Sequence, residues 1–168
     1  SIKKYLLYSS VFAIFTEAIF FNFTSDWKLL YRIILVNFIL MLRIKKIVFN
    51  VYFLLLLLFF FLHGLLCYSI IGIPYIFMLS QIIGIAILGT YYYNFVSLYK
   101  PIEIINLYCK MAFWVAVIGY PLYFLGIQVG NAGDDRFYSF FKEPAHYCIV
   151  VLPACYYYFK QKNYLRFF

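Results

Sequence analysis

The chain has 168 residues, of which 67% are hydrophobic and only 12% are charged. A soluble domain is about 45–50% apolar and about 25% charged, so a water-soluble fold of this size is excluded. The formal net charge of +8 does not indicate nucleic-acid binding, because the basic residues form short clusters between apolar runs. Composition and charge therefore predict an all-α integral membrane protein with no nucleic-acid partner.

Six apolar stretches have the composition of membrane-spanning helices. A bilayer core of about 30 Å takes roughly 20 helical residues for each crossing. The expected spans are Tyr5 to Phe23, Trp27 to Leu42, Ile47 to Tyr68, Pro74 to Phe95, Met111 to Ile127 and His146 to Phe159. They predict a polytopic helical bundle of about six spans, in one transmembrane domain over 1–168.

Basic residues occupy every second gap between these spans. They are Lys3 and Lys4 before the first span, Arg43, Lys45 and Lys46 after the second, Lys100 and Lys110 after the fourth, and Lys160, Lys162 and Arg166 after the sixth. Cytoplasmic loops are enriched in Lys and Arg, so both termini are expected in the cytoplasm. The other gaps, including a loop at 128–144, are then expected on the external side.

Small and helix-breaking residues within the spans predict local packing features. Gly84 and Gly89 would permit close contact between helices. Pro121 and Pro153 each remove a backbone donor, which predicts a kink and leaves the carbonyl of Ile149 without its usual partner. The four cysteines form no CxxC pair and are expected to be small buried hydrophobic residues.

Two ionisable residues, Glu17 and His63, fall inside predicted spans. A charged side chain at the centre of a membrane costs about 2.5–3.5 kcal/mol unless it faces the bundle. Either residue could therefore line a channel for a lipid substrate.

The external loop is expected to carry most of the polar residues that a site needs. Pro144 suits the first turn of a helix, so we expect the sixth helix to begin there, with Glu143 at its cap. The free N–H groups of a helix N-terminus bind anions, and Arg136 and Lys142 would add cations. His146, three residues after Glu143, would lie on the same helix face.

A simpler interpretation of the same residues is purely structural. Glu143 would only cap the helix, Arg136 would pair with Asp134 or Asp135, and His146 would lie in the membrane interface. The residue types alone leave both interpretations open.

Residues 136–147 read Arg-Phe-Tyr-Ser-Phe-Phe-Lys-Glu-Pro-Ala-His-Tyr and precede an apolar run. This segment resembles the Arg-Phe-x-(Gly/Ser)-x-Phe-x-Glu-Pro-(Ser/Ala)-(His/Phe) segment of bacterial O-antigen and capsule repeat-unit polymerases, the Wzy family. The likeness is specific over these residues and generic elsewhere, and Ser139 stands where the family often has Gly. Because family members have more spans and a second large periplasmic loop, the resemblance implies an N-terminal portion of a longer chain.

The resemblance implies a glycosyltransferase-type polymerase of the bacterial inner membrane, acting at its periplasmic face. A growing glycan on undecaprenyl diphosphate would be transferred to a new lipid-linked repeat unit, without a cofactor or metal ion. The implied partners are that lipid-linked glycan, membrane lipid, and the chain-length regulator and flippase of the same pathway.

Residue roles follow from matching this chemistry to the segment. Arg136, together with Lys142, is expected to bind the diphosphate, which needs cations and helix N–H donors as it leaves. Glu143 or His146 is the candidate base for the attacking sugar hydroxyl.

Two further residues, Asp135 and Tyr138, are candidates for substrate binding. Tyr138 could bind a sugar face or the prenyl chain, or serve as an interfacial anchor. The alternative functions are an O-antigen ligase, which uses the same lipid carrier, and a non-catalytic protein such as a colicin-immunity protein. A transporter is disfavoured because the chain has no internal repeat, and the Glu143-Pro144 dipeptide favours the polymerase over the ligase.

Overall fold

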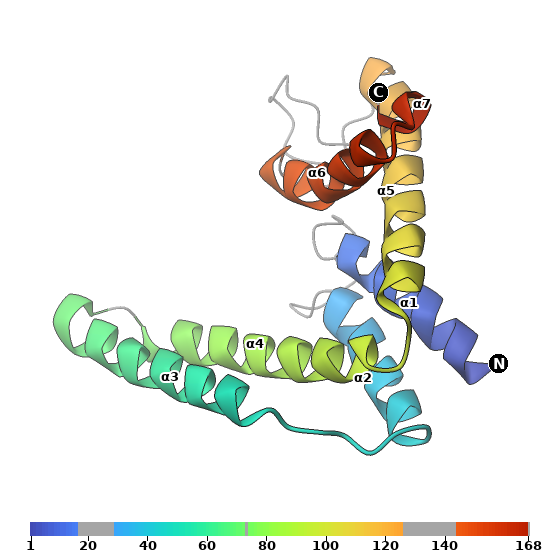
Figure 1. Ribbon diagram of the computed structural model, residues 1–168. Helices are drawn as coiled ribbons and strands as arrows, with labels where there is room; N and C mark the ends of the chain where they lie inside the picture. Colours follow the sequence, from blue (N-terminus) through green and yellow to red (C-terminus); the bar gives the residue numbers. More distant parts are fainter. Residues whose placement is uncertain (17–28, 73, 126–143, 168) are drawn as a thin grey trace. The chain divides into compact units, whose positions relative to one another are not determined.

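The computed structural model of the chain describes residues 1–16, 29–72, 74–125 and 144–167 (Figure 1). These residues form helices and, within the described ranges, no strand. The helices are α1 (Ile2–Thr16), α2 (Leu29–Leu42), α3 (Val51–Ile71), α4 (Tyr75–Val96), α5 (Pro101–Phe124), α6 (Pro144–Lys160) and the short α7 (Tyr164–Phe167). The predicted all-α class is confirmed for this part of the chain.

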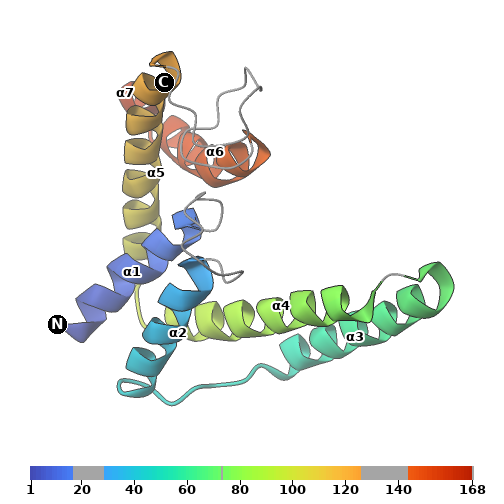
Figure 2. The same ribbon diagram turned by 180° about the vertical axis from the view of Figure 1, so that it is seen from behind.

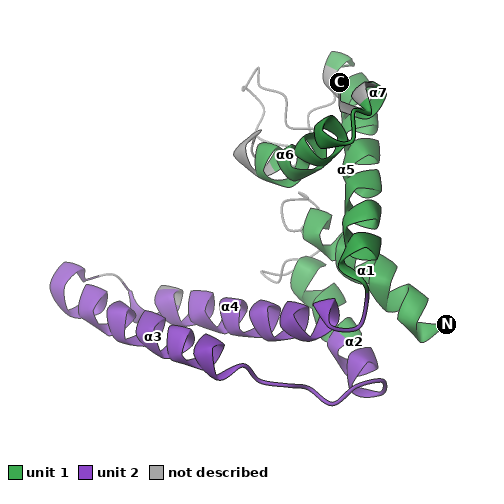
Figure 3. Ribbon diagram, in the orientation of Figure 1, with its two compact units in different colours: residues 1–37, 100–168 green, residues 38–99 purple. Residues whose placement is uncertain are grey.

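The chain divides into two compact units, coloured separately in Figure 3. Unit 1 contains Ser1–Asn37 and Lys100–Phe168, and unit 2 contains Phe38–Tyr99. The first boundary falls within α2 and the second lies between α4 and α5.

Two of the described helices, α3 and α5, are long and apolar enough to cross a membrane. α3 has 21 residues and a mean hydropathy of 2.5, and residues Pro101–Leu122 of α5 have a mean hydropathy of 1.5. Only 6% of the α3 window is buried inside the protein, unlike the core helix of a soluble domain. Length and composition therefore indicate association with a membrane.

α3 and α4 form an antiparallel hairpin and lie side by side in both views (Figures 1 and 2). Each helix contributes a glycine to the contact. A Cβ atom on Gly64 of α3 would overlap the side chain of Met78, and one on Gly89 of α4 would overlap the ring of Phe53. The close contact predicted at Gly89 is confirmed, and Gly64 is a second site of the same kind.

The segment before α3 is not helical, although the expected span began at Ile47. The helix begins at Val51 because the Asn50 side chain caps it, accepting hydrogen bonds from the backbone N–H groups of Tyr52 and Phe53 at 2.9 and 3.4 Å. Asparagine is among the preferred N-cap residues. The helix ends at Gly72, which has a φ of 73° and donates its N–H to the Tyr68 carbonyl.

Asn94 of α4 binds the backbone of this non-helical segment. Its Oδ1 accepts a hydrogen bond from the Val48 N–H, and its Nδ2 donates to the Val48 carbonyl, both at 2.9 Å. The amide also donates to the Thr90 carbonyl and is completely buried. One side chain thus satisfies both backbone polar groups of Val48, which lies outside the helices.

A second contact lies at the same end of the hairpin, where the Lys45 ammonium donates to the Ser97 hydroxyl. The basic residues 43–46 therefore lie beside the C-terminal end of α4. The charge pattern of the sequence predicts this proximity, because it assigns the basic gaps before α3 and after α4 to one side.

The fifth helix begins ten residues before the expected Met111, so the interpretation of 101–110 as a loop is wrong. Proline fits the first helical position, and Glu103 in the first turn complements the helix dipole. Lys110 consequently lies within α5. With 24 residues the helix is about 36 Å long, which exceeds a hydrocarbon core of about 30 Å and allows its first turns to extend into the interface.

In unit 1, α1 packs on α5 and is linked by polar side chains to α2. The rings of Phe15 and Tyr108 lie 5.3 Å apart, which joins α1 to α5. The buried Asn37 of α2 accepts a hydrogen bond from Ser9 at 3.0 Å and donates one to Ser10 at 3.4 Å. Hydrogen bonds between small polar side chains are common where helices associate in membranes.

We predict that Gly89→Leu destabilises the α3–α4 hairpin, because the new side chain would occupy the space of the Phe53 ring. Overpacking of this kind costs about 1–3 kcal/mol. The free energy of unfolding, measured by SDS titration with far-UV circular dichroism, should fall by that amount. Ser69→Leu places the same side chain at an exposed position of α3 and should leave the value unchanged. Equal losses in both variants would contradict the packing account.

Candidate functional site

The predicted site residues lie at the start of α6 and in the loop before it. Arg136, Tyr138, Lys142 and Glu143 fall outside the described residues, and so does Asp135. Their convergence therefore stays a prediction.

The start of the sixth helix is confirmed, because α6 begins at Pro144. Proline suits this position because the N–H group that it lacks would have no partner within the helix, and because its fixed φ is close to the helical value. His146 is the third residue of α6, and its side chain lies outside the description. The backbone N–H groups of this first turn have no partner within the helix and can bind an anion.

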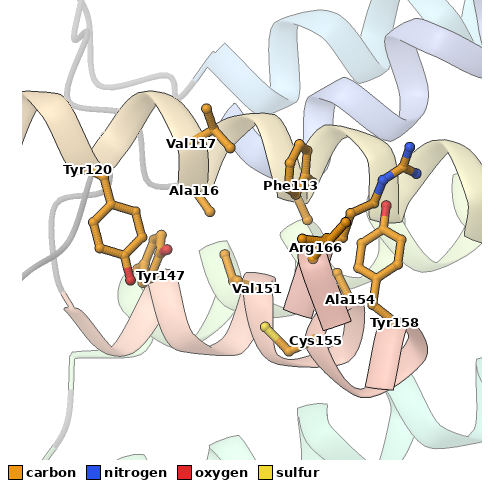
Figure 4. Close-up of a pocket in the computed structure, with 12 residues that line it drawn as sticks. Phe113, Ala116, Val117, Tyr120, Tyr147, Val151, Ala154, Cys155, Tyr158 and Arg166 are labelled. Carbon is orange, nitrogen blue, oxygen red and sulfur yellow. The ribbon is translucent and has the colours of Figure 1, made fainter. Parts of the chain in front are cut away.

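Immediately after His146, α6 packs against α5 and encloses a pocket of about 330 Å³ (Figure 4). α6 is steeply inclined to α5 rather than aligned with it (Figures 1 and 2). Tyr120 of α5 lies next to Tyr147 of α6 at one end, and Phe113 lies near Tyr158 at the other. The first end is adjacent in sequence to the predicted site residues, which precede Tyr147 by one to twelve positions.

The centre of the pocket is lined by small and aliphatic side chains. Ala112 and Ala116 of α5 are one helical turn apart, and Val151 and Ala154 of α6 lie opposite. Small residues four apart let two helices approach closely. The pocket is lined here by these short side chains, between the larger aromatic side chains at its two ends.

Arg166 of α7 supplies the cationic side chain at the second end. Its guanidinium carbon lies 5.8 Å from the ring centroid of Tyr158 and 5.9 Å from that of Phe113. These two rings are themselves 6.5 Å apart at an interplanar angle of 74°. Such cation–π contacts contribute about 0.5–1 kcal/mol each at exposed sites, so the two rings orient the guanidinium although Arg166 itself is exposed.

The turn between α6 and α7 brings Arg166 back over the pocket. Lys162 adopts the left-handed conformation with a φ of 56°. The Asn163 N–H donates to the Tyr158 carbonyl at 3.0 Å, and the Lys162 N–H donates to the Phe159 carbonyl at 2.9 Å. This pair of hydrogen bonds is the Schellman motif, which usually has glycine at the left-handed position.

Two hydroxyl groups tie α5 to α6 beside the pocket. The Tyr108 hydroxyl donates to the Val150 carbonyl, and the Tyr157 hydroxyl donates to the Asn106 side chain, both at 2.5 Å. Val150 follows Ile149, whose carbonyl loses its intrahelical donor because of Pro153. The sequence indicated a disturbed backbone here, but it did not indicate that a tyrosine of α5 would bind next to it.

The cysteines differ from the expectation of burial. All four are free; Cys109 is buried, Cys67 and Cys155 are partly buried, and Cys148 is exposed on α6. The expectation is wrong for Cys148, which lies on a face of α6 that packs against no described helix.

The intramembrane polar residues give a mixed result. His63 is exposed on α3, where it stacks on Phe59 with ring centroids 6.1 Å apart and lies 3.6 Å from the Cys67 sulfur. Its role in a channel therefore stays a prediction. Glu17 lies outside the described residues.

Comparisons with known proteins add no assignment. No family model, no curated protein and no solved structure matches the chain.

Sequence reasoning did not find the pocket, and it treated Arg166 only as a charge that sets orientation. Two signals were present. Ala112 and Ala116 form a small-xxx-small pattern on α5, and Gln161-Lys162-Asn163 is a polar interruption between an apolar helix and Arg166. Neither signal specifies a pocket without the partner helix.

We predict that Lys162→Gly stabilises the protein, because an L-residue in the left-handed region costs about 1–2 kcal/mol that glycine avoids. The measured quantity is the free energy of unfolding in detergent. Lys160→Gly removes the same charge from the last residue of α6 and should destabilise by about 0.5–1 kcal/mol. The account fails if the two glycine variants change stability in the same direction.

Proposed function

We propose that this chain is part of a multi-pass protein of the bacterial inner membrane that polymerises undecaprenyl-diphosphate-linked oligosaccharide repeat units into O-antigen or capsular polysaccharide. The observation that carries the proposal is the segment from Arg136 to Tyr147, which resembles the Wzy family and whose last four residues form the first turn of α6.

The multi-pass arrangement is supported by the described helices. α3 and α5 have the length and hydropathy of membrane spans. In the α3–α4 pair, the basic residues 43–46 lie at one end, beside Ser97. The opposite end of this pair lacks basic residues among the described positions, as expected if the basic end faces the cytoplasm.

The proposed reaction moves a growing glycan from its lipid carrier to a hydroxyl of the next repeat unit. The hydroxyl oxygen of the acceptor sugar attacks the anomeric carbon of the donor, and the bond from that carbon to the diphosphate oxygen breaks. The acceptor proton passes to a base, and undecaprenyl diphosphate leaves with the bonding electrons. The enzyme must therefore stabilise an anionic leaving group and accept one proton.

The residues of the loop suit these two tasks. Arg136 and Lys142 supply cations for the diphosphate, and the backbone N–H groups in the first turn of α6 lie at the helix terminus that favours anions. Proline itself donates no hydrogen bond, so the usable donors begin at Ala145. Glu143 or His146 accepts the proton.

We predict that Arg136→Ala and Glu143→Gln each abolish long-chain glycan in a polymerase-deleted strain complemented with the full-length protein. The loss of one charged contact to a leaving diphosphate typically lowers the rate about 10²–10³-fold. Glycan length is measured by silver-stained gel electrophoresis of lipopolysaccharide or capsule, with protein levels checked by immunoblotting. Lys46→Gln removes an exposed charge outside the loop and serves as the control.

Normal glycan length in both Arg136→Ala and Glu143→Gln would contradict the site assignment. A ligase is distinguished by the intermediate that accumulates, because loss of a ligase leaves full-length glycan on undecaprenyl diphosphate, whereas loss of a polymerase leaves single repeat units. The lipid-linked fraction of each variant therefore tests the reaction class separately from the residues.

A further inference from the structure

The Arg166 end of the pocket between α5 and α6 is strongly basic. Lys160 and Lys162 are exposed next to Arg166 in the chain, and Lys110 is exposed on α5 one turn before Phe113. Among the described residues the sole acidic side chain is Glu103, in the first turn of α5. The positive potential at this end is therefore not neutralised by the described part of the protein.

The remainder of the pocket is apolar. From Arg166 it extends past Ala112, Ala116 and Ala154 toward Val117 and Val151 (Figure 4). Val117 is 40% exposed and Leu165 is 93% exposed, so the pocket opens at its side. A volume of about 330 Å³ is at the lower limit of sites that hold small molecules, which are about 300–1,000 Å³.

Arg166 is oriented before any ligand arrives. The rings of Phe113 and Tyr158 hold the guanidinium carbon within 6 Å, and the Lys162 turn fixes the direction of α7. A guanidinium stacked on aromatic faces still presents N–H donors along its edge, and these match the oxygens of a phosphate group. Preorganisation of this kind lowers the entropy cost of binding.

We propose that this pocket binds an anionic phospholipid, with its phosphodiester at Arg166 and the first part of an acyl chain over Ala112 and Ala116. The combination of a cationic end with an apolar, laterally open remainder fits a molecule that has a phosphate at one end and hydrocarbon at the other. A free phosphate ion would leave the apolar part unused. A zwitterionic lipid would bring its own cation toward Lys160 and Lys162.

This inference goes beyond the proposed polymerase activity and does not depend on it. The lipid would bind at the Arg166 end of the pocket, whereas the residues proposed for the reaction come just before Tyr147, which lines the other end, in the sequence.

The test is lipid binding to the full chain in maltoside detergent, measured by native mass spectrometry during titration with dioleoyl phosphatidylglycerol or dioleoyl phosphatidylcholine. We expect phosphatidylglycerol to bind about tenfold more tightly than phosphatidylcholine, because one hydrogen bond between charged groups contributes about the free energy of a tenfold difference in affinity. Arg166→Gln should reduce this preference to within about twofold, because the guanidinium is removed while the stem of the side chain is kept. Arg166→Lys, which keeps the charge, should retain most of the preference.

Two controls separate this site from general surface charge. Lys4→Gln removes an exposed charge from α1 and should leave the preference unchanged. Ala116→Phe fills the apolar part without changing charge and should weaken phosphatidylglycerol binding about tenfold. Equal effects of Arg166→Gln and Lys4→Gln would overturn the proposal. So would complete displacement of the lipid by millimolar inorganic phosphate, because the site would then bind only the anion.

Discussion

A hydrocarbon environment gives a backbone N–H or C=O group no water to bind, so the chain must satisfy each of them internally. Most of the described chain does so by forming helices, and the exceptions are served by particular side chains. Asn50 caps α3, Asn94 binds both polar groups of Val48, and the Tyr108 hydroxyl binds the Val150 carbonyl. Among the described residues, no buried side-chain nitrogen or oxygen lacks a hydrogen bond. These polar contacts allow α3 and α6 to begin, end or bend within an apolar protein.

The helix pairs then follow from what lies on the contacting faces. Gly64 and Gly89 let α3 and α4 approach closely, whereas α5 and α6 have tyrosines at both ends of their contact and alanines between them. In the first pair each glycine contacts a side chain of the other helix, and in the second pair a pocket lies between the helices. In the α3–α4 pair the basic residues Arg43, Lys45 and Lys46 gather at one end, as expected for an end that faces the cytoplasm.

The sequence predicts features that depend on neighbouring residues in the chain better than those that depend on distant ones. The start of α6 at Pro144 and the contact at Gly89 followed from local chemistry. The start of α5 at Pro101 was also signalled locally, by proline and Glu103, but two lysines suggested a loop. The binding of Asn94 to Val48, 46 positions away, and the return of Arg166 over Phe113 depend on tertiary packing that periodicity does not encode. The convergence of the residues from Arg136 to Glu143 into a site remains a prediction from the sequence.

The central claim is that the basic gaps and the loop at 128–144 lie on opposite sides of a membrane. Single cysteines at Ser139 and Lys46, introduced after replacing the four native cysteines with alanine, allow a direct test with a membrane-impermeant maleimide on cells whose outer membrane has been permeabilised. The account predicts labelling of Ser139→Cys while the inner membrane is intact, and labelling of Lys46→Cys only after the inner membrane is disrupted. Labelling of Lys46→Cys while the inner membrane is intact, with Ser139→Cys protected until that membrane is disrupted, would contradict the account.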